Sequence, residues 1–361
     1  MQLNTLRNSR EKQHERELVN TLKKMNKLGE TEVPPFSYGI NNLGISGENE
    51  RKEFEKFVDN WFRNPASFLN FEKYSPPPLP SISNKKELGE SCFTFKSFVD
   101  KGDTAKFFAS PQPFYGRGER IAFIIIPHWS SHFGKYKLGT SVIRNFFIPT
   151  ASYRYFPTYK TEKFYKDRPR YDIVGPDLGL IIKRVWQDTL NIQYFAKYLK
   201  EDLGYEKVGL WATSIGSLRG YLASMFSENL IDFLIMHSLA DSFPKALLGG
   251  ISTQPIAKAI LENTDEEETE FLLSPLSPGH YGKYLTYLPK NTRLVQGKYD
   301  LVFGEENNRR MVEKLRRNAP FVEIEYGKFG HTTYGEVDKV IPMVFRNSKF
   351  VFRNSKLRFL I

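Results

Sequence analysis

The chain has 361 residues, 40% of them hydrophobic and 26% charged, which is the composition of a folded globular protein rather than a disordered one. Its single cysteine, Cys92, excludes an internal disulfide and any zinc site built from several cysteines. No apolar run approaches the roughly 20 residues of a membrane-spanning helix. The formal net charge of +11 favours anionic partners, whether lipid headgroups, acidic small molecules or nucleic acid. Because no secretory signal core precedes the first charged residues, we expect a cytoplasmic protein, with peripheral contact with an anionic membrane surface left open.

The first part of the chain is predicted to be helical. Residues 10–28 form a charged segment with a weak apolar stripe, and residues 48–63 place five apolar side chains on one face at helical spacing: Phe54, Phe57, Val58, Trp61 and Phe62. We expect this face to pack on a core, with a membrane-surface helix as the alternative. A proline-rich stretch at 74–91 follows and is typical of a linker. The predicted division is an N-terminal helical extension with its linker, 1–89, and a main domain, 90–361.

From residue 92 onward, short β-prone runs alternate with helix-period segments. The strands are expected at 92–99, 105–109, 121–127, 147–155, 207–212, 231–237, 292–296 and 322–326, and the clearest helices at 177–202, 217–227 and 305–318. This alternation predicts an α/β fold with a mostly parallel sheet flanked by helices. Residues 242–291 lack a clear strand and are too many for a simple loop, so they are predicted to be a helical cap insertion.

The stretch GLWATSIGS at 209–217 joins a predicted strand to a predicted helix. Its pattern is that of a nucleophile elbow, small-x-Ser-x-Gly, with Ala212 in place of the usual first glycine. A serine on such a sharp corner has strained backbone angles, so the residues two before and two after it must be small. The pattern marks Ser214 as a candidate nucleophile, although a small residue at an ordinary strand–helix junction would give the same letters.

Two downstream residues fit the roles that a nucleophilic serine needs, in the order acid and then histidine. Asp300 follows the predicted strand in LVQGKYDLVF, and His331 lies in a glycine-flanked loop after the last strand, in VEIEYGKFGHTTYG. Each alone has an ordinary explanation, as a helix cap or a turn. Together they predict the triad Ser214, Asp300 and His331, with Asp241 as the alternative acid.

An oxyanion hole in this arrangement takes one backbone N–H from the residue after the nucleophile, Ile215. The second donor is expected after the buried strand that ends in Pro-His-Trp, from Trp129 or Ser130. His128 and His132 have the spacing of a metal pair, but they lie in a predicted loop with no obvious third ligand. We therefore predict no metal ion and no cofactor.

These motifs resemble those of the α/β-hydrolase superfamily, and more narrowly the α/β-hydrolase domain-containing protein 18 group and its prokaryotic relatives. The resemblance is carried by PHW at 127–129, RYDIVGPDLG at 170–179, GLWATSIGS at 209–217, LSPGHYGKY at 276–284, GKYDLVF at 297–303 and GHTTYG at 330–335. It implies a serine-hydrolase triad at Ser214, Asp300 and His331 and a lipid ester or related acyl substrate. The first ninety residues carry little of it.

The segment SYRYFPTYKTEKFYKDRPRYD interleaves basic and aromatic residues after the fourth predicted strand. In an α/β-hydrolase it borders the serine, so it predicts an apolar-walled entrance that steers anions; the alternative is a solvated loop anchored by its aromatic side chains. The leading hypothesis is a serine hydrolase that cleaves a carboxylic ester, with a lipid ester among the substrates. The alternatives are an acyltransferase with the same triad and a non-catalytic protein that binds membranes or, less favoured, nucleic acid.

Overall fold

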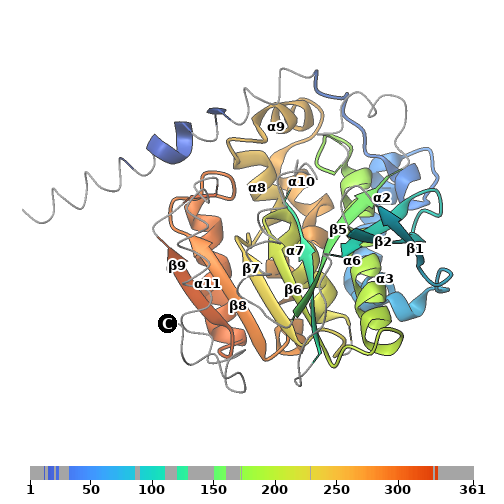
Figure 1. The fold of residues 1–361 in the computed structure, drawn as a ribbon. Helices are drawn as coiled ribbons and strands as arrows, with labels where there is room; N and C mark the ends of the chain where they lie inside the picture. Colours follow the sequence, from blue (N-terminus) through green and yellow to red (C-terminus); the bar gives the residue numbers. More distant parts are fainter. Residues whose placement is uncertain are drawn as a thin grey trace, which may run out of the picture.

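A computed structural model gives the structure of the protein (Figure 1). It describes residues 12, 15–19, 22–23, 32–85, 90–109, 120–128, 150–159, 171, 173–227, 229–327 and 330–331. All statements below concern these residues. Trp129, Ser130 and His132 lie outside the described residues, as does most of the basic and aromatic segment after residue 159.

The described strands form one mixed sheet in the order β1-β2-β3-β5-β4-β6-β7-β8-β9. Its first three strands are antiparallel to their neighbours, and the pairs from β5 to β9 are parallel. The bounds are β1 Ser81–Lys85, β2 Glu90–Lys96, β3 Thr104–Ala109, β4 Ile121–Ile126, β5 Thr150–Thr158, β6 Lys207–Thr213, β7 Phe233–His237, β8 Asn291–Gly297 and β9 Glu323–Gly327. This is the mostly parallel sheet that the alternating pattern predicts.

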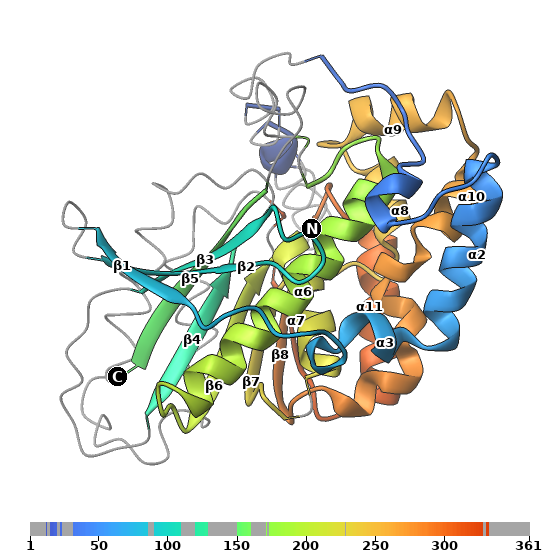
Figure 2. The same cartoon turned by 90° about the vertical axis from the view of Figure 1, so that its right-hand side faces the viewer.

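Three helices follow the parallel strands and flank the sheet: α6 Leu178–Glu201, α7 Ile215–Met225 and α11 Glu305–Asn318. The helices α6 and α7 lie side by side on one face of the sheet (Figure 2). Helix α6 begins where the Asp177 side chain accepts a hydrogen bond from the Leu180 N–H, a normal N-cap. Among the described residues, no helix is both long and apolar enough to cross a bilayer.

The N-terminal helices pack on the outside of α6 and belong to the same hydrophobic core. They are η1 Ile40–Leu43, α2 Glu50–Arg63, α3 Pro65–Leu69 and η2 Phe71–Lys73. In α2 the side chains of Phe54, Val58 and Trp61 are wholly buried, and the Trp61 indole donates to the Tyr281 hydroxyl at 2.8 Å. The apolar face of this helix therefore packs into the core, and the membrane-surface alternative is wrong for it.

One strand lies where the sequence predicts only a linker. β1 follows the proline run directly and pairs with β2 along five residues, from Ser81 opposite Thr94 to Lys85 opposite Glu90. As an edge strand it needs only one partner, so a short polar segment suffices, and hydrophobic periodicity gives no signal for it.

The chain between β7 and β8, where the sequence predicts a cap insertion, is mostly helical. It contains α8 Phe243–Gly249, α9 Gln254–Leu261, α10 Glu266–Leu272, η5 Ser274–Leu276 and η6 Pro278–Tyr287. The helices α8 and α9 lie at the end of the sheet where the parallel strands finish (Figure 1). η6 packs against α7 and α11. α10 contacts α2, where the Glu268 Oε1 lies 3.1 Å from the Arg51 Nε.

Candidate active site

The turn from β6 into α7 is sharply bent at Ser214. This residue has φ 59° and ψ −124°, a region that side-chain-bearing residues rarely occupy and that costs of order 1–3 kcal/mol. Gly216 is needed on its far side, because a Cβ there would lie 2.5 Å from the Ile126 carbonyl oxygen and 2.6 Å from that of Pro127. Ala212 is completely buried, so a larger residue would not fit there without displacing its neighbours.

Hydrogen bonds to the end of β7 hold the bent turn. The Ser214 N–H donates to the His237 carbonyl at 2.8 Å. The buried Ser217 hydroxyl accepts from the His237 N–H at 3.1 Å and lies 3.0 and 3.1 Å from the carbonyl oxygens of His237 and Ala212. One hydroxyl thus joins the ends of β6 and β7 under the serine, which is how the surroundings can impose strained backbone angles.

Asp300, His331 and Ser214 form a continuous hydrogen-bonded line. The His331 Nδ1 lies 2.8 Å from the Asp300 Oδ2, and its Nε2 lies 2.8 Å from the Ser214 Oγ. The three side chains come from the turn after β8, the loop after β9 and the elbow. Asp300 is 1% exposed, and its Oδ1 accepts from the N–H groups of Val302 and Phe303, both at 2.9 Å. The structure thus brings together all three residues that the sequence selects.

The electrostatics of the line favour an ionised carboxylate. Burial opposes the charge of Asp300, but the His331 ring and the two backbone N–H groups outweigh it and hold the pKa of Asp300 below its usual value. A second histidine, His237, lies close enough that His331 and Asp300 both affect its pKa. Burial, with a smaller repulsive contribution from His331, lowers the pKa of His237 to about 3, so it is neutral at ordinary pH.

Asp241, the alternative acid, points elsewhere. The Lys314 Nζ lies 2.7 and 2.9 Å from its two carboxylate oxygens, which joins the end of β7 to α11.

Of the expected oxyanion donors, Ile215 is the first residue of α7, where backbone N–H groups have no partner within the helix. Among the described residues, no group of three or more His, Cys, Asp or Glu side chains gathers as metal ligands would.

One contact at the site has no signal in the sequence. The Glu17 side chain, from the N-terminal segment, is completely buried against Gly330, the residue before His331. A Cβ on Gly330 would lie 2.6 Å from the Glu17 Cγ and closer still to its carboxyl group. Contacts between segments so far apart in the chain leave no periodicity or spacing to read.

Comparison with known proteins bears on the fold. No protein-family model matches the chain, and no curated protein matches it. Among solved structures, an acetyl xylan esterase from a Paenibacillus species matches with a TM-score of 0.54 and 12% identity over 84% of this chain and 96% of that one. An acetyl xylan esterase from a Thermoanaerobacterium species matches with a TM-score of 0.50 and 13% identity over 79% and 92%. Together with the strand order and the elbow, these matches show that the chain has the α/β-hydrolase fold. They give no support for membership of the narrower group that the sequence motifs resemble.

Proposed function

We propose that the protein is a serine hydrolase that cleaves a carboxylic ester through an acyl-enzyme on Ser214. The Ser214 Oγ attacks the ester carbonyl while the His331 Nε2 takes its proton. Asp300 holds the imidazole with its Nδ1 proton inward and stabilises the imidazolium. The Ile215 N–H stabilises the developing oxyanion, and His331 then gives the proton to the leaving alkoxide. A water molecule, activated by His331, releases the acid and restores the serine.

The observation that carries this proposal is the hydrogen-bonded line from Asp300 through His331 to Ser214 at the start of a helix. Each bond has the length expected between a nucleophile, its base and the group that orients the base. The serine is only 6% exposed, and hydrogen bonds to an oxyanion are worth more at a buried position than in water. The fold of two acetyl xylan esterases supports ester chemistry by analogy alone.

A fluorophosphonate probe tests the proposal directly, because it phosphonylates only an activated serine. We expect wild-type protein to be labelled and Ser214→Ala to be inert. The matched control is Ser224→Ala, a buried serine of the same helix α7, which should be labelled like the wild type. Equal labelling of wild type and Ser214→Ala would remove Ser214 as the nucleophile.

The substrate class needs a second measurement, because the triad serves several acyl esters. We propose a panel of p-nitrophenyl esters of increasing chain length and of phospholipids, with turnover on lipid esters expected if the motif resemblance extends to substrate. Product analysis with and without an added alcohol separates hydrolysis from acyl transfer. Binding to anionic vesicles by a protein inert toward every ester would favour the non-catalytic alternative.

A further inference from the structure

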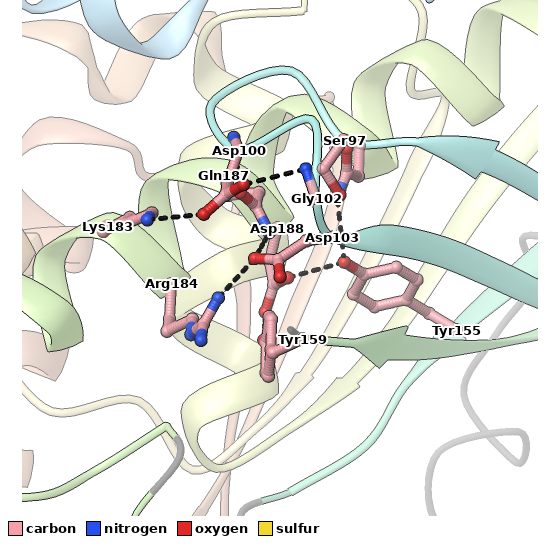
Figure 3. A network of polar contacts seen from close by, with 11 residues as sticks. Ser97, Asp100, Gly102, Asp103, Tyr155, Tyr159, Lys183, Arg184, Gln187 and Asp188 are labelled. Atoms are coloured by element: carbon pink, nitrogen blue, oxygen red, sulfur yellow. Dashed lines mark hydrogen bonds and ion pairs between the residues drawn. The ribbon is translucent and has the colours of Figure 1, made fainter. Parts of the chain in front are cut away.

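A cluster of buried polar side chains lies between α6, the β2–β3 turn and the end of β5 (Figure 3), and an ion pair extends it to α7. At its centre is Asp188 of α6, whose Oδ1 accepts from the Tyr155 hydroxyl at 2.6 Å and whose Oδ2 accepts from the Tyr159 hydroxyl at 2.7 Å. Arg219 of α7 forms an ion pair with the same carboxylate, its Nε lying 3.0 Å from the Oδ2. Asp188 and Arg219 are both almost completely buried. One carboxylate therefore joins three separate elements.

Stability alone is a weak reason for such a pair. Two charges lose their hydration when they are buried, and well-packed apolar residues of similar volume are often as stable or more so. Burial raises the pKa of Asp188, with the Arg219 charge and the two phenols opposing the rise. What the cluster supplies and apolar residues do not is direction, because the hydrogen bonds from Tyr155 and Tyr159 to Asp188 have defined geometry, while Arg219 is held by its charge.

On one side the cluster holds the helix of the nucleophile. Arg219 lies one helical turn after Ile215, the expected oxyanion donor. An adjacent side of the helix packs closely against the sheet: a Cβ on Gly216 would lie 2.5 Å from the Ile126 carbonyl oxygen, and one on Gly220 would lie 3.1 Å from the Ala212 Cβ. The first turns of α7 thus contact the sheet at these glycines and Asp188 through Arg219.

On the other side the cluster holds the end of β5. The strand register places Arg154 of β5 beside Ile125 of β4, which pairs in turn with Trp211 of β6, so the residues after Arg154 reach the level of the elbow. The two strands β5 and β6 are two spacings apart, about 10 Å. Tyr159 follows the last residue of β5, and the Arg184 guanidinium stacks on its ring at 3.9 Å. The chain then continues into the segment predicted to border the entrance.

We propose that Asp188 is a positioning residue: it fixes the first turn of α7, and with it the Ser214 hydroxyl and the Ile215 N–H, relative to the end of β5 at the predicted entrance. The inference rests on the proposed function, because positioning matters only if Ser214 reacts. Asp188 touches no substrate. Its effect reaches the reaction through Arg219, and displacements of about 1 Å at such distance can cost as much as 100-fold in rate.

A second buried pair of α6 provides the matched control. Asp103, between β2 and β3, is completely buried, binds Arg184 and accepts from the Gln187 amide at 3.0 Å. It links α6 to the β2–β3 turn and reaches Asp188 only indirectly, through the stacking of Arg184 on Tyr159. Asp103→Asn and Asp188→Asn therefore remove one buried negative charge each beside one buried arginine. Both should lower the melting temperature, while only Asp188→Asn should alter the reaction.

The measurements are the rate of fluorophosphonate labelling and kcat and KM for p-nitrophenyl acetate, taken well below each melting temperature. We expect Asp188→Asn to lower kcat by roughly tenfold or more with KM nearly unchanged. Tyr159→Phe removes one hydrogen bond to Asp188 and keeps the ring, so it should lower kcat by roughly threefold. Asp103→Asn should stay within about twofold of wild type. If Asp188→Asn does not fold, the kcat of Tyr159→Phe tests the positioning role in its place.

The outcomes separate the two proposals. A wild-type rate in Asp188→Asn or, failing its folding, in Tyr159→Phe overturns the positioning role and leaves the hydrolase intact. An equal loss of kcat in Asp103→Asn also overturns it, because the effect would then not be specific to the carboxylate that binds Arg219. A wild-type protein that reacts with neither reagent overturns the proposed function, and the positioning role with it.

Discussion

Replacing Asp300 by asparagine tests the triad most sharply, because the change keeps the shape of the side chain. The Asp300 Oδ1 accepts from the Val302 and Phe303 N–H groups, and its Oδ2 faces the His331 Nδ1. In Asp300→Asn the amide oxygen must stay with the two N–H donors. The opposite orientation would leave both donors buried without an acceptor, at a cost of about 1–3 kcal/mol each.

The amide NH₂ group of Asp300→Asn then faces the histidine, and it can only donate. The His331 Nδ1 must become the acceptor, so the ring proton moves to Nε2, where it faces the Ser214 Oγ. A protonated Nε2 cannot take the serine proton. The same change of tautomer in a serine-protease triad lowers kcat by about 10⁴, which corresponds to about 5.5 kcal/mol of transition-state stabilisation.

The assay is hydrolysis of p-nitrophenyl acetate, with thermal denaturation to show that Asp300→Asn remains folded. Asp241→Asn is the matched control: it also changes an aspartate after a parallel strand, but one that binds Lys314. It should keep most of the wild-type kcat. Retention of more than about one tenth of kcat by Asp300→Asn, or an equal loss in Asp241→Asn, would contradict the assignment of the acid.

Three further predictions concern the surroundings of the triad. Ser217→Ala leaves the buried His237 N–H without its acceptor and should lower the free energy of unfolding by about 1–3 kcal/mol in urea denaturation; an unchanged value would contradict the role of this hydroxyl in holding the elbow. The folded protein keeps His237 neutral down to about pH 3, whereas the unfolded chain protonates it below 6.5, so stability is lost as the pH falls. Between pH 6.5 and about pH 5 wild type should lose about 2 kcal/mol more than His237→Gln, and parallel losses would show that the shift is small. Gly330→Ala places a methyl group against Glu17 and should lower the rate of ester hydrolysis roughly tenfold, with recovery in the double variant Glu17→Ala/Gly330→Ala; a double variant as slow as the single one would show that this contact does not limit the reaction.

The sheet and the elbow could be predicted because both leave local signals. Residues 209–217 carry the strand, the strained corner and the helix start within one short stretch, and the structure has β6, Ser214 and α7 there. The bounds of β5 are harder to predict from the sequence. The strand is expected at 147–155 and lies at Thr150–Thr158, where Pro157 pairs in register with Ala105, beyond the last residue that pairs with β4. A proline without an N–H is tolerated there, since only one neighbour remains.

The choice of acid shows where sequence reasoning stops. Asp241 and Asp300 both follow parallel strands and both lie between Ser214 and His331 in the chain, so chain order allows either; the position of Asp300 after the next-to-last strand favours it without excluding Asp241. The difference lies in their surroundings: two backbone N–H groups orient Asp300 toward His331, while a lysine of α11 holds Asp241. Neither the N–H groups nor the lysine can be read from spacing, because they depend on how loops and helices pack. The same is true of Asp188 and Arg219, which meet only when α6 and α7 lie side by side.

Two serines with strained backbone angles lie at the ends of the neighbouring strands β6 and β7. Ser214 and Ser238 both have φ 59°, and each donates its N–H to the adjacent strand, Ser214 to the His237 carbonyl and Ser238 to the Val295 carbonyl at 3.0 Å. Strained residues persist only where their surroundings over-determine them. Here a parallel neighbour, the Ser217 hydroxyl and a close-packed helix all act on the same corner. A corner that only joined a strand to a helix would have no need of that many constraints, whereas a serine that must meet His331 at hydrogen-bond distance does.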